Sequence, residues 1–579
     1  MKIQGTEFRS RFAGTEITTR GVVTLETESG GSFWIQDPSG DGDPATSDGI
    51  YVYEGERAGN VRVGDLIEIT ADVEEWVPRA SPASQPITEL VSPTRISVLA
   101  SNQRLPQPVA ITDLPNQSIA EALLLWESVE GMRVRLTDGV VVSPTTRFGE
   151  FALVVAADAT SGSGFFPEVS RLVVGVRDDG TVDYNPERVI VDDGSLEEAP
   201  IVVPGTRIAE IVGVVDYSFG NYKVQPERIT FAGPSDLDRG AGGEEVAGGE
   251  ARAGGEEGHD ATMLSIVSFN AENLFDRSNN PLKDDSRSTP SPRELEVKLE
   301  KLVRAVRDLL ELPEIIVVQE TENEEILQTV GDLVDDLVGT TDYVARSFES
   351  SDGRGIENAF LYDTSRVTLV ESWQLEGEDV DAAFGPDSPS PGREPIVGVF
   401  DVGPPLFPSS ADSRFITIVG NHFKSKGGDE PIYGVNRPPN RPTEEQRRDQ
   451  ATVVRRFVDS IFAEDPESLV IVAGDMNDFQ FGEPGEPEDH PLAILESTQP
   501  RMRNVVDEMP PAERHSYVYD GNSQVLDHLL VSPALEPFVA DAEFLRGNAG
   551  SPAALSADGS TFRRSSDHDP LRIRLKSID

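Results

Sequence analysis

The stretch SLVIVAGDMND, residues 468–478, decides the fold of the C-terminal half of this chain. Its apolar part has the length of a strand and ends at Gly474, so Asp475 and Asn477 follow where the strand ends. A packed sheet holds side chains rigidly at its strand ends, which favours a site there. Because Asp475 and Asn477 are two positions apart, both can face the same cleft.

Five other segments combine an apolar run with polar residues at one end: SFNAENLF, IIVVQE, IVGNHFKSK, VLDHLLVS and SSDHDP. Their polar positions are Asn270, Glu320, Asn421 with His422, Asp527 with His528, and Asp567 with His568. Carboxylates, carboxamides and imidazoles gathered in this way suit metal-assisted attack on a phosphate ester.

Helical stretches alternate with these strands. RELEVKLEKLVRAVRDLL and TEEQRRDQATVVRRFVDSIF repeat apolar residues at helical spacing, and Thr443 is placed to cap the second. Strands interleaved with helices predict sheets covered by helices, with the site at the strand ends.

The N-terminal half has a different composition and a different apolar pattern. Residues 234–262 are rich in Gly, Ala and Glu and predict a flexible acidic linker. Before it, residues 1–102 and 103–233 carry short strands rich in β-branched and aromatic residues, typical of two small barrels. The two stretches resemble distant copies, because Gly64, Ile67, Val73 and Trp76 recur at the same offsets as Gly205, Ile208, Val214 and Tyr217.

Four aromatic residues of the first stretch, Trp34, Tyr51, Tyr53 and Trp76, could stack nucleic-acid bases. The segments around them are acidic, so the positive groove that such binding needs is missing. A core or rim role is the commoner outcome for such residues.

The chain is strongly acidic. Acidic residues number 102 against 50 basic ones, a formal charge of -52. Self-repulsion of this size destabilises a compact state unless salt screens it, which favours a salt-rich habitat over a merely acidic soluble protein. There is no cysteine, which excludes disulfides and thiolate chemistry. We find neither an apolar run of membrane length nor a signal peptide in the chain as given.

The ordered set SFNAEN, VVQETEN, GRGIENAFLYD, NHFKSK, GDMND, LDHLLVS and SDHDP resembles the endonuclease/exonuclease/phosphatase superfamily with the DNase I-like fold, over residues 263–579. The N-terminal half, through QDPSGDGDPATSDGIYV, VDDGS and DYSFGNYKVQP, is similar to secreted multidomain nucleases of the ExeM type. The resemblance implies two all-β OB-like barrels followed by an α/β four-layer sandwich. It also implies an extracellular location.

The resemblance assigns metal binding to Asn270, Glu320 and Asp567. A carboxylate leaving an apolar strand suits Mg²⁺, whereas the alternative for Glu320 is a solvent-facing residue at a strand end. Glu272 would share the strand face of Asn270 but is not carried over as a ligand.

Five residues are expected to be catalytic: His422, Asp475, Asn477, Asp527 and His568. Asp475 would position or deprotonate the attacking water, and Asn477 would bind a phosphate oxygen. His422 and His568 match histidines at the scissile phosphate, and Asp527 would orient His568. For His528, a catalytic role and a structural hydrogen-bonding role remain equally open.

Cations near these motifs are candidates for contacting substrate. Arg354 lies in GRGIEN, and Lys424 with Lys426 follows His422, so a small positive patch could meet a phosphate backbone. The alternative is a solvated charged surface with no ligand.

Together these observations predict a nuclease that uses Mg²⁺ or Mn²⁺, with Ca²⁺ as an alternative, and cuts DNA, or else RNA, with little sequence preference. A second hypothesis keeps the site and changes the substrate to a phosphoinositide, sphingolipid or other small phosphate ester. A third is a binding protein with an inactive catalytic domain. We expect a monomer without an obligate protein partner and without a membrane contact.

Overall fold

The structure is a computed structural model that describes residues 3–27, 31–53, 61–155, 164–194, 196–233, 263–280, 283, 289–403, 415–483, 489–497 and 500–576. The predicted linker 234–262 lies outside the described residues. The chain divides into two compact units. The N-terminal unit takes in Met1–Gly248 with Glu430–Asn440 and Asp520–Asn522, and the C-terminal unit takes in the remainder.

The N-terminal unit begins with a closed barrel. Its strands, in spatial order, are β1 (Glu16–Glu26), β2 (Ser32–Gln36), β3 (Gly49–Tyr53), β5 (Ile87–Ala100) and β4 (Leu66–Trp76). Only β3 and β5 run parallel among the barrel pairings described. Apolar residues alternate along these strands, so Ile50 and Val52 fill the barrel while Tyr51 and Tyr53 face outward.

A six-stranded sheet follows in the same unit. Its order is β14 (Arg207–Ser218), β15 (Asn221–Phe231), β13 (Val189–Val191), β8 (Phe151–Val155), β7 (Arg133–Val141) and β6 (Val109–Ile111). β14 also pairs with β7, and β13 runs parallel to β15. The pairing scheme of the first barrel thus recurs, in agreement with the predicted copy. Gly64 and Gly205 precede the matching strands β4 and β14, both with positive φ, 88° and 90°.

Smaller elements complete the unit. They are α1 (Ile119–Glu127) and the strand pairs β9 (Phe165–Phe166) with β10 (Arg171–Leu172) and β11 (Gly175–Val176) with β12 (Val182–Asp183).

The C-terminal unit contains two six-stranded sheets. The first has the order β18 (Tyr343–Ser347), β19 (Glu357–Asp363), β17 (Ile315–Thr321), β16 (Met263–Leu274), β29 (Leu571–Lys576) and β28 (Val539–Phe544). The second has the order β20 (Thr368–Gln374), β21 (Arg393–Asp401), β22 (Phe415–His422), β23 (Leu469–Asp475), β27 (Asp527–Val531) and β24 (Arg503–Asn504). Two further short strands are β25 (Tyr517–Tyr519) and β26 (Asn522–Gln524).

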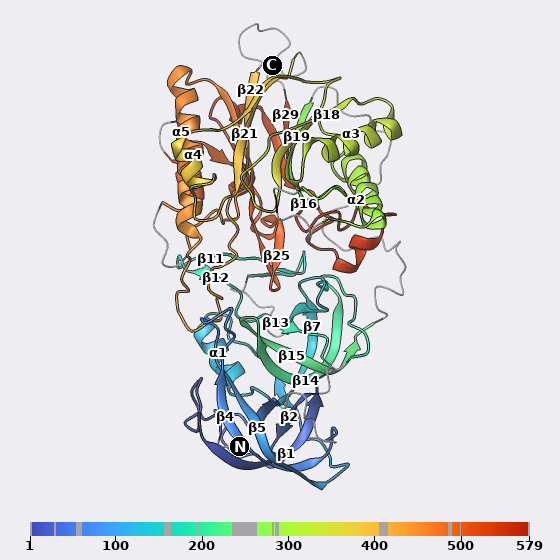
Figure 1. The fold of residues 1–579 in the computed structure, drawn as a ribbon, viewed down its shortest axis with the longest axis vertical. Helices are drawn as coiled ribbons and strands as arrows, with labels where there is room; N and C mark the ends of the chain where they lie inside the picture. Colours follow the sequence, from blue (N-terminus) through green and yellow to red (C-terminus); the bar gives the residue numbers. More distant parts are fainter. Residues whose placement is uncertain are drawn as a thin grey trace. The chain divides into compact units, whose positions relative to one another are not determined.

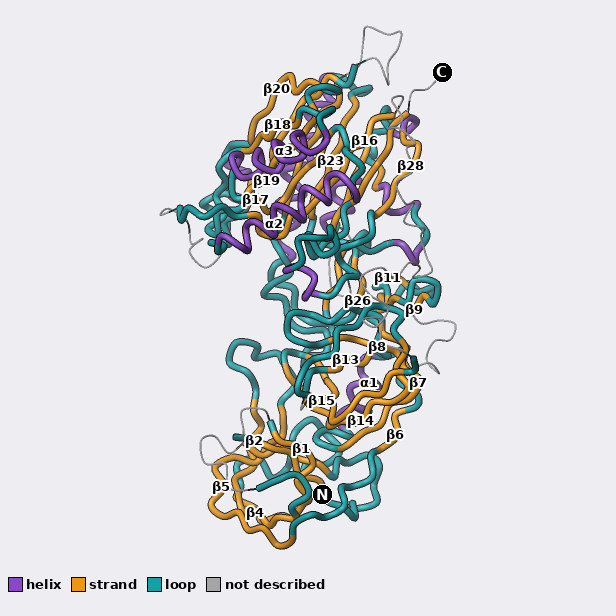
Figure 2. The backbone as a smooth tube through the Cα atoms, turned by 90° about the vertical axis from the view of Figure 1, so that its right-hand side faces the viewer, coloured by secondary structure: helices purple, strands orange, loops and turns teal. Residues whose placement is uncertain are grey.

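Helices cover the outer faces of both sheets. They are α2 (Pro292–Arg304), continued by a π-helical turn at Ala305–Leu309, α3 (Glu324–Val338), α4 (Glu378–Ala383), α5 (Glu444–Glu464) and α6 (Pro491–Glu496). Short 3₁₀ turns lie at Val505–Glu508, Pro511–Glu513, Glu536–Phe538 and Ala553–Ala557. Figure 1 shows α4 and α5 on one side of the paired sheets and α2 and α3 on the other, and Figure 2 looks onto α2 and α3.

Side chains along each strand alternate between the two faces of its sheet, so each sheet packs on the other sheet with one face and on helices with the other, in a four-layer sandwich. Ile266 joins the core between the two sheets, whereas its neighbour Val267 joins the core under α2 and α3. In the second sheet, Ile418 faces the same central core and Val419 faces α5. A strand with both faces covered is apolar throughout, which is why SLVIVAG is a nearly continuous apolar run.

Two helix starts follow sequence signals. Ser291 and Glu294 form a capping box at α2. Thr443 precedes α5 as predicted, but its side chain makes no cap hydrogen bond. It donates instead to Asp429 Oδ1 at 2.8 Å.

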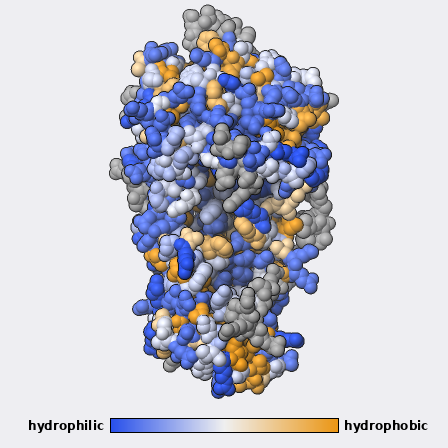
Figure 3. All heavy atoms as spheres, in the orientation of Figure 1, coloured by the Kyte–Doolittle hydropathy of each residue, from blue (hydrophilic) through white to orange (hydrophobic). Residues whose placement is uncertain are grey.

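Hydrophilic residues predominate on the face drawn in Figure 3, with apolar residues scattered among them. Among the described residues, no helix combines the length and apolar character needed to cross a membrane.

Candidate active site

Four polar side chains form one in-register row across the second sheet of the C-terminal unit. Arg393 on β21 pairs with His422 on β22, His422 with Asp475 on β23, and Asp475 with Asp527 on β27. Register neighbours project from the same face of a sheet, so the row gathers at one end of the strands. All four residues are buried.

Asp475 is the centre of this arrangement. Its Oδ2 accepts a hydrogen bond from Asn270 Nδ2 at 3.1 Å and lies 3.5 Å from His422 Nε2 and 3.9 Å from His568 Nε2. Its Oδ1 accepts the backbone N–H of Asn477 at 2.9 Å. Asn270 ends the regular part of β16 in the first sheet, so both sheets contribute to one cluster.

The approach of β22 to β23 beside Asp475 requires glycine. A Cβ on Gly474 would lie 2.0 Å from the carbonyl oxygen of Asn421, and Gly474 has φ 142°. Only glycine adopts this conformation freely. The glycine in GDMND therefore sets the close strand spacing that brings Asp475 beside His422.

His568 and Asp527 form a hydrogen-bonded pair, with Nδ1 and Oδ2 2.7 Å apart. The loop that carries His568 is fixed, since Asn548 Nδ2 donates to the His568 carbonyl at 2.8 Å. The ring of Tyr517 lies 4.7 Å from the His568 ring, centroid to centroid. Asp475, Asp527 and His568 thus make a buried group whose potential ligand atoms all lie within 4.8 Å of one another.

The environment sets different protonation states. Burial raises the pKa of Asp475 to about 7, with His568 opposing the rise. Burial acts to lower the pKa of His568, but the charge and hydrogen bond of Asp527 raise it well above its ordinary value. Burial, with the charges of Arg393 and Arg354, lowers the pKa of His422 well below its ordinary value. Near neutral pH the cluster therefore holds a charged imidazole, a neutral imidazole and a carboxylate able to take a proton.

Glu320 lies at the end of β17, beside the row. Its Oε2 accepts the backbone N–H of Asn273 at 3.0 Å, and its Oε1 is 3.9 Å from His422 Nε2. Glu320 has a positive φ of 63°, which is rare for a residue other than glycine. Strained backbone of this kind is found at functional sites.

Two more carboxylates belong to the same region. Burial and the charges of Asp567 and Glu320 raise the pKa of Glu272. Arg564 Nη2 is 3.6 Å from Glu272 Oε1. Burial lowers the pKa of Lys298. The charges of Glu272, Asp567 and Glu320 oppose this lowering.

The predicted substrate cations differ from one another. The Arg354 side chain is 51% exposed and its Nε lies 3.7 Å from Asp352 Oδ1. Lys424 is half-buried, and burial with neighbouring cations lowers its pKa. Lys426 pairs with Asp478 at 2.9 Å. The predicted patch therefore fails for Lys426, because its ammonium holds an internal carboxylate.

Two further predicted residues have internal partners. His528 is fully buried, with Nδ1 3.0 Å from Asn504 Nδ2 and Nε2 2.8 Å from the Asp478 carbonyl. Burial lowers its pKa to about 4. Of the two roles left open for His528, the contacts favour the structural one. Asn477 Nδ2 donates to the Phe423 carbonyl at 3.2 Å, and its predicted phosphate contact stays a prediction.

Sequence reasoning missed Arg393, Tyr517, Asn548 and Asp569. Asp569 Oδ1 accepts the backbone N–H of Asn548 at 2.9 Å, so the second aspartate of SDHDP holds the loop beneath His568. Because Asp569 lies inside the SDHDP motif, its role could have been predicted from the sequence. Arg393 follows a stretch rich in Pro, Ser and Gly, and no motif marks it as a site residue.

Two family models match parts of this chain. The family model described as Endonuclease/Exonuclease/phosphatase family matches residues 265–387 and 407–545. A model described as Domain of unknown function (DUF8508) matches residues 92–233. No curated protein matches the chain. The family match supports an endonuclease/exonuclease/phosphatase domain in the C-terminal unit.

Several solved structures are similar. An endonuclease/exonuclease/phosphatase from Bacteroides vulgatus is 14% identical, over 55% of this chain and 99% of its own, with a TM-score of 0.34. A mannosyl-6-phosphatase from Bacteroides thetaiotaomicron is 17% identical, over 54% of this chain and 98% of its own, with a TM-score of 0.32. The human Nocturnin catalytic domain with bound sulfate is 14% identical, over 55% of this chain and 94% of its own, with a TM-score of 0.35.

Proposed function

We propose that this chain is a metal-dependent phosphodiesterase that hydrolyses nucleic acid, DNA in the first place, with little sequence preference and in salt-rich surroundings. The observation that supports this most is the cluster around Asp475. Residues separated by up to 298 positions, Asn270 and His568 among them, place a carboxamide and two imidazoles within 3.9 Å of one carboxylate oxygen. These groups are what in-line attack of water on a phosphodiester requires.

Each residue has a chemical task in this proposal. Asp475 orients the attacking water and takes its proton, since a base works best when its pKa is close to the working pH. His568 is held protonated by Asp527 and donates a proton to the departing oxygen. The neutral His422 and the amide of Asn477 donate hydrogen bonds to phosphoryl oxygens as negative charge develops there.

The carboxylates at the edge of the cluster fit a divalent cation. Glu272, Glu320 and Asp567 lie close enough for their charges to act together on Lys298, where they oppose the lowering of its pKa by burial. Among the described residues, the hydrogen bond of the Glu320 carboxylate is made by Oε2, whereas Oε1 lies 3.9 Å from His422 Nε2. Glu320 and Asp567, with Asn270, would hold the metal, and an oxygen-rich set of this kind suits Mg²⁺ or Mn²⁺. When bound, the cation would polarise the phosphoryl group and screen the developing charge.

The acidic surface makes salt part of the proposal. A formal charge of -52 repels a polyanion, but the repulsion shortens to about 3 Å at about 1 M salt. Salt also weakens contacts between cations and phosphates, so Arg354 and Lys424 hold the backbone less tightly. We expect low activity in dilute buffer and an optimum at elevated salt. Activity that is highest at low ionic strength and declines throughout would contradict the salt argument.

The test is incubation of the full chain with circular plasmid DNA across Mg²⁺, Mn²⁺, Ca²⁺ and a series of salt concentrations. Asp475→Ala and His568→Gln should each lower kcat by about 10²- to 10⁴-fold. His528→Gln is the matched control, because His528 is also a buried histidine but contacts only Asn504 and the Asp478 backbone. It should lower Tm and leave kcat close to the parent value.

Substrate class is decided by a parallel measurement. The same samples are offered bis(p-nitrophenyl) phosphate, a phosphoinositide and sphingomyelin. Intact plasmid with fast turnover of a small ester would replace the nuclease proposal by the small-ester alternative. No turnover of any substrate with any metal would leave a binding protein.

A further inference from the structure

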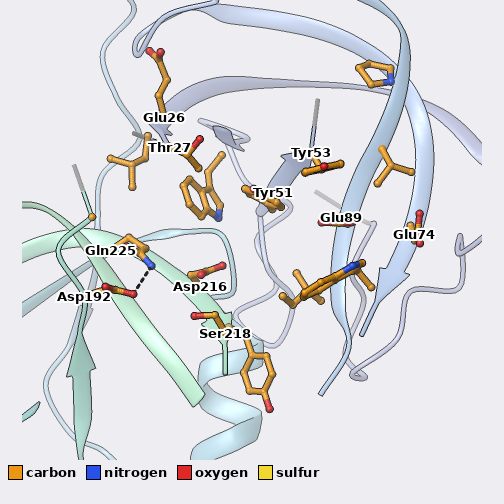
Figure 4. Close-up of a pocket in the computed structure, with 18 of the residues that line it drawn as sticks. Glu26, Thr27, Tyr51, Tyr53, Glu74, Glu89, Asp192, Asp216, Ser218 and Gln225 are labelled. Atoms are coloured by element: carbon orange, nitrogen blue, oxygen red, sulfur yellow. Dashed lines mark hydrogen bonds between the residues drawn. The ribbon is translucent and has the colours of Figure 1, made fainter. Parts of the chain in front are cut away.

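A large cleft lies within the N-terminal unit, between the barrel and the six-stranded sheet. Its volume is about 1610 Å³. Figure 4 shows Tyr51, Tyr53, Glu74 and Glu89 entering it from the barrel, with Asp216, Ser218 and Gln225 on the opposite wall. The four aromatics that the sequence singled out, Trp34, Tyr51, Tyr53 and Trp76, all line it together with Tyr217. They lie outside the barrel core, although Trp34 is itself buried in a small cluster with Leu25 and Val214.

Strand register places the lining of the barrel wall in a row. Trp34 pairs with Tyr51, Tyr51 with Glu89, and Glu89 with Glu74, across β2, β3, β5 and β4. The buried neighbours of these residues along each strand fill the barrel, so the row belongs to its outer face. The Trp34 and Tyr51 rings lie 4.9 Å apart, centroid to centroid, tilted by 48°. Two aromatic faces are thus followed by two carboxylates along one line.

The charge of the lining has one sign. Among the described residues of the lining, the ionisable side chains apart from the tyrosines are six carboxylates, from Glu26, Glu74, Glu89, Asp192, Asp193 and Asp216, with no Lys, Arg or His. Some of the six have partners outside the lining: the backbone N–H of Val63 donates to Glu26 Oε1 at 2.8 Å, and Lys223 Nζ lies 3.6 Å from Asp192 Oδ2. Gln225 Nε2 also donates to this oxygen at 3.2 Å. A phosphate backbone would be repelled here, so the base-stacking role considered for these aromatics does not fit the cleft.

Glu89 is the buried carboxylate of the row. It is 5% exposed. Within the described part of the chain, its carboxylate has neither a hydrogen bond nor an ion pair, and it lines the cleft. Burial, with the charges of Glu74 and Asp216, raises the pKa of Glu89 to about 7. A buried carboxylate without a donor is costly, and a cation in the cleft would satisfy it.

We propose that this cleft binds an elongated organic polyamine, whose protonated nitrogens meet the carboxylates of Glu89, Glu74 and Asp216 while its methylene chain lies on the aromatic faces. Aromatic faces attract organic cations through the ring quadrupole. A bare metal ion would leave those faces unused, and a neutral sugar would leave the carboxylates uncompensated. The volume exceeds the range of about 300–1,000 Å³ typical of compact ligands, which favours a long one.

The test is calorimetric titration of the full chain with spermine at constant ionic strength and at a pH of about 8, where Glu89 is ionised and spermine is still charged. Single-site binding is expected for the parent. Glu89→Gln should weaken it by about tenfold through loss of one desolvated charge contact. Trp76→Ala should weaken it by about fivefold through loss of one cation–π face. Glu371→Gln, an exposed carboxylate on β20, controls for net charge and should leave the affinity unchanged.

Stability separates a binding role from a structural one. Glu89→Gln removes an uncompensated buried charge, so Tm of the unliganded chain should rise while spermine affinity falls. A merely structural Glu89 would move both downward or leave affinity alone. Equal affinity in the parent and in Glu89→Gln would overturn the proposal, as would tighter binding of maltohexaose or of a single-stranded oligonucleotide than of spermine. None of these readouts depends on the catalytic site.

Discussion

The substitution Asp527→Asn isolates the charge of the residue that faces His568. The two side chains are 2.7 Å apart, and they are 1% and 6% exposed. Asparagine keeps an oxygen that can accept the Nδ1–H bond, so the imidazole stays in place while the negative charge disappears. Burial, which acts to lower the pKa of His568, is then opposed only by the smaller effects of the Asp475 and Asp567 charges and by the remaining hydrogen bond.

The expected fall in kcat follows from the loss of a proton donor. In the parent, the raised pKa keeps His568 charged through neutral pH, and its alkaline deprotonation should set the alkaline limb of the kcat profile. In Asp527→Asn the pKa falls, so the limb moves to lower pH and kcat at neutral pH drops by about 10²- to 10⁴-fold. The raised pKa also contributes stability that is present below the ordinary histidine pKa and is lost as pH rises through the folded-state value. The variant should lack this dependence.

The assay is plasmid cleavage across pH with saturating metal, together with thermal unfolding at each pH. Half-activating metal concentration is measured as well, because Asp527 belongs to the buried Asp/Asp/His group. An unchanged alkaline limb with less than about fivefold loss of kcat would refute the proposed pairing. A large rise in the half-activating metal concentration, with the limb unmoved, would make Asp527 a metal ligand instead.

Three further substitutions test how the site is held. Arg447→Met removes a fully buried cation that pairs with Asp478 at 2.7 Å, and urea unfolding should show a loss of about 3–5 kcal/mol; an unchanged midpoint would count against the network. Lys301→Met leaves four carbonyls of residues 555–563 without their shared donor, and faster proteolysis in that segment is expected; parental cleavage rates would dismiss this role. Gly474→Ala puts a Cβ 2.0 Å from a backbone oxygen of β22, so both Tm and kcat should fall, and parental values would show that the strands can separate at no cost.

Much of the candidate site around Asp475 could be predicted because its signal is local. An apolar run followed by polar residues marks a strand end, and a sheet brings strand ends together, so Asn270, His422 and Asp475 follow from short windows of sequence. The different roles of Asp527 and His528 could also have been predicted from the sequence. Alternation along β27 sends the two side chains to opposite faces, so only one of them can join the row. That argument would have favoured the structural role for His528.

What could not be predicted depends on partners that are distant in the chain. Arg393 joins the row because β21 pairs with β22 in one register, and no local pattern encodes that register. The order of strands in the two sheets is likewise a long-range property. The division of the chain at residues 102, 233 and 262 and the extracellular location stay predictions.

The distribution of positive charge bears on the proposed salt dependence. Arg393, Arg447 and Lys301 lie buried, bonded to carboxylates or backbone carbonyls. Lys426 is likewise paired with Asp478. These cations are engaged in pairs inside the protein and stabilise the scaffold around the site. With a net charge of -52, long-range attraction of a polyanion cannot come from the protein as a whole. Under the proposed function, binding of nucleic acid would rely on short-range contacts at the site itself, and these would become accessible when the solvent screens the remaining surface.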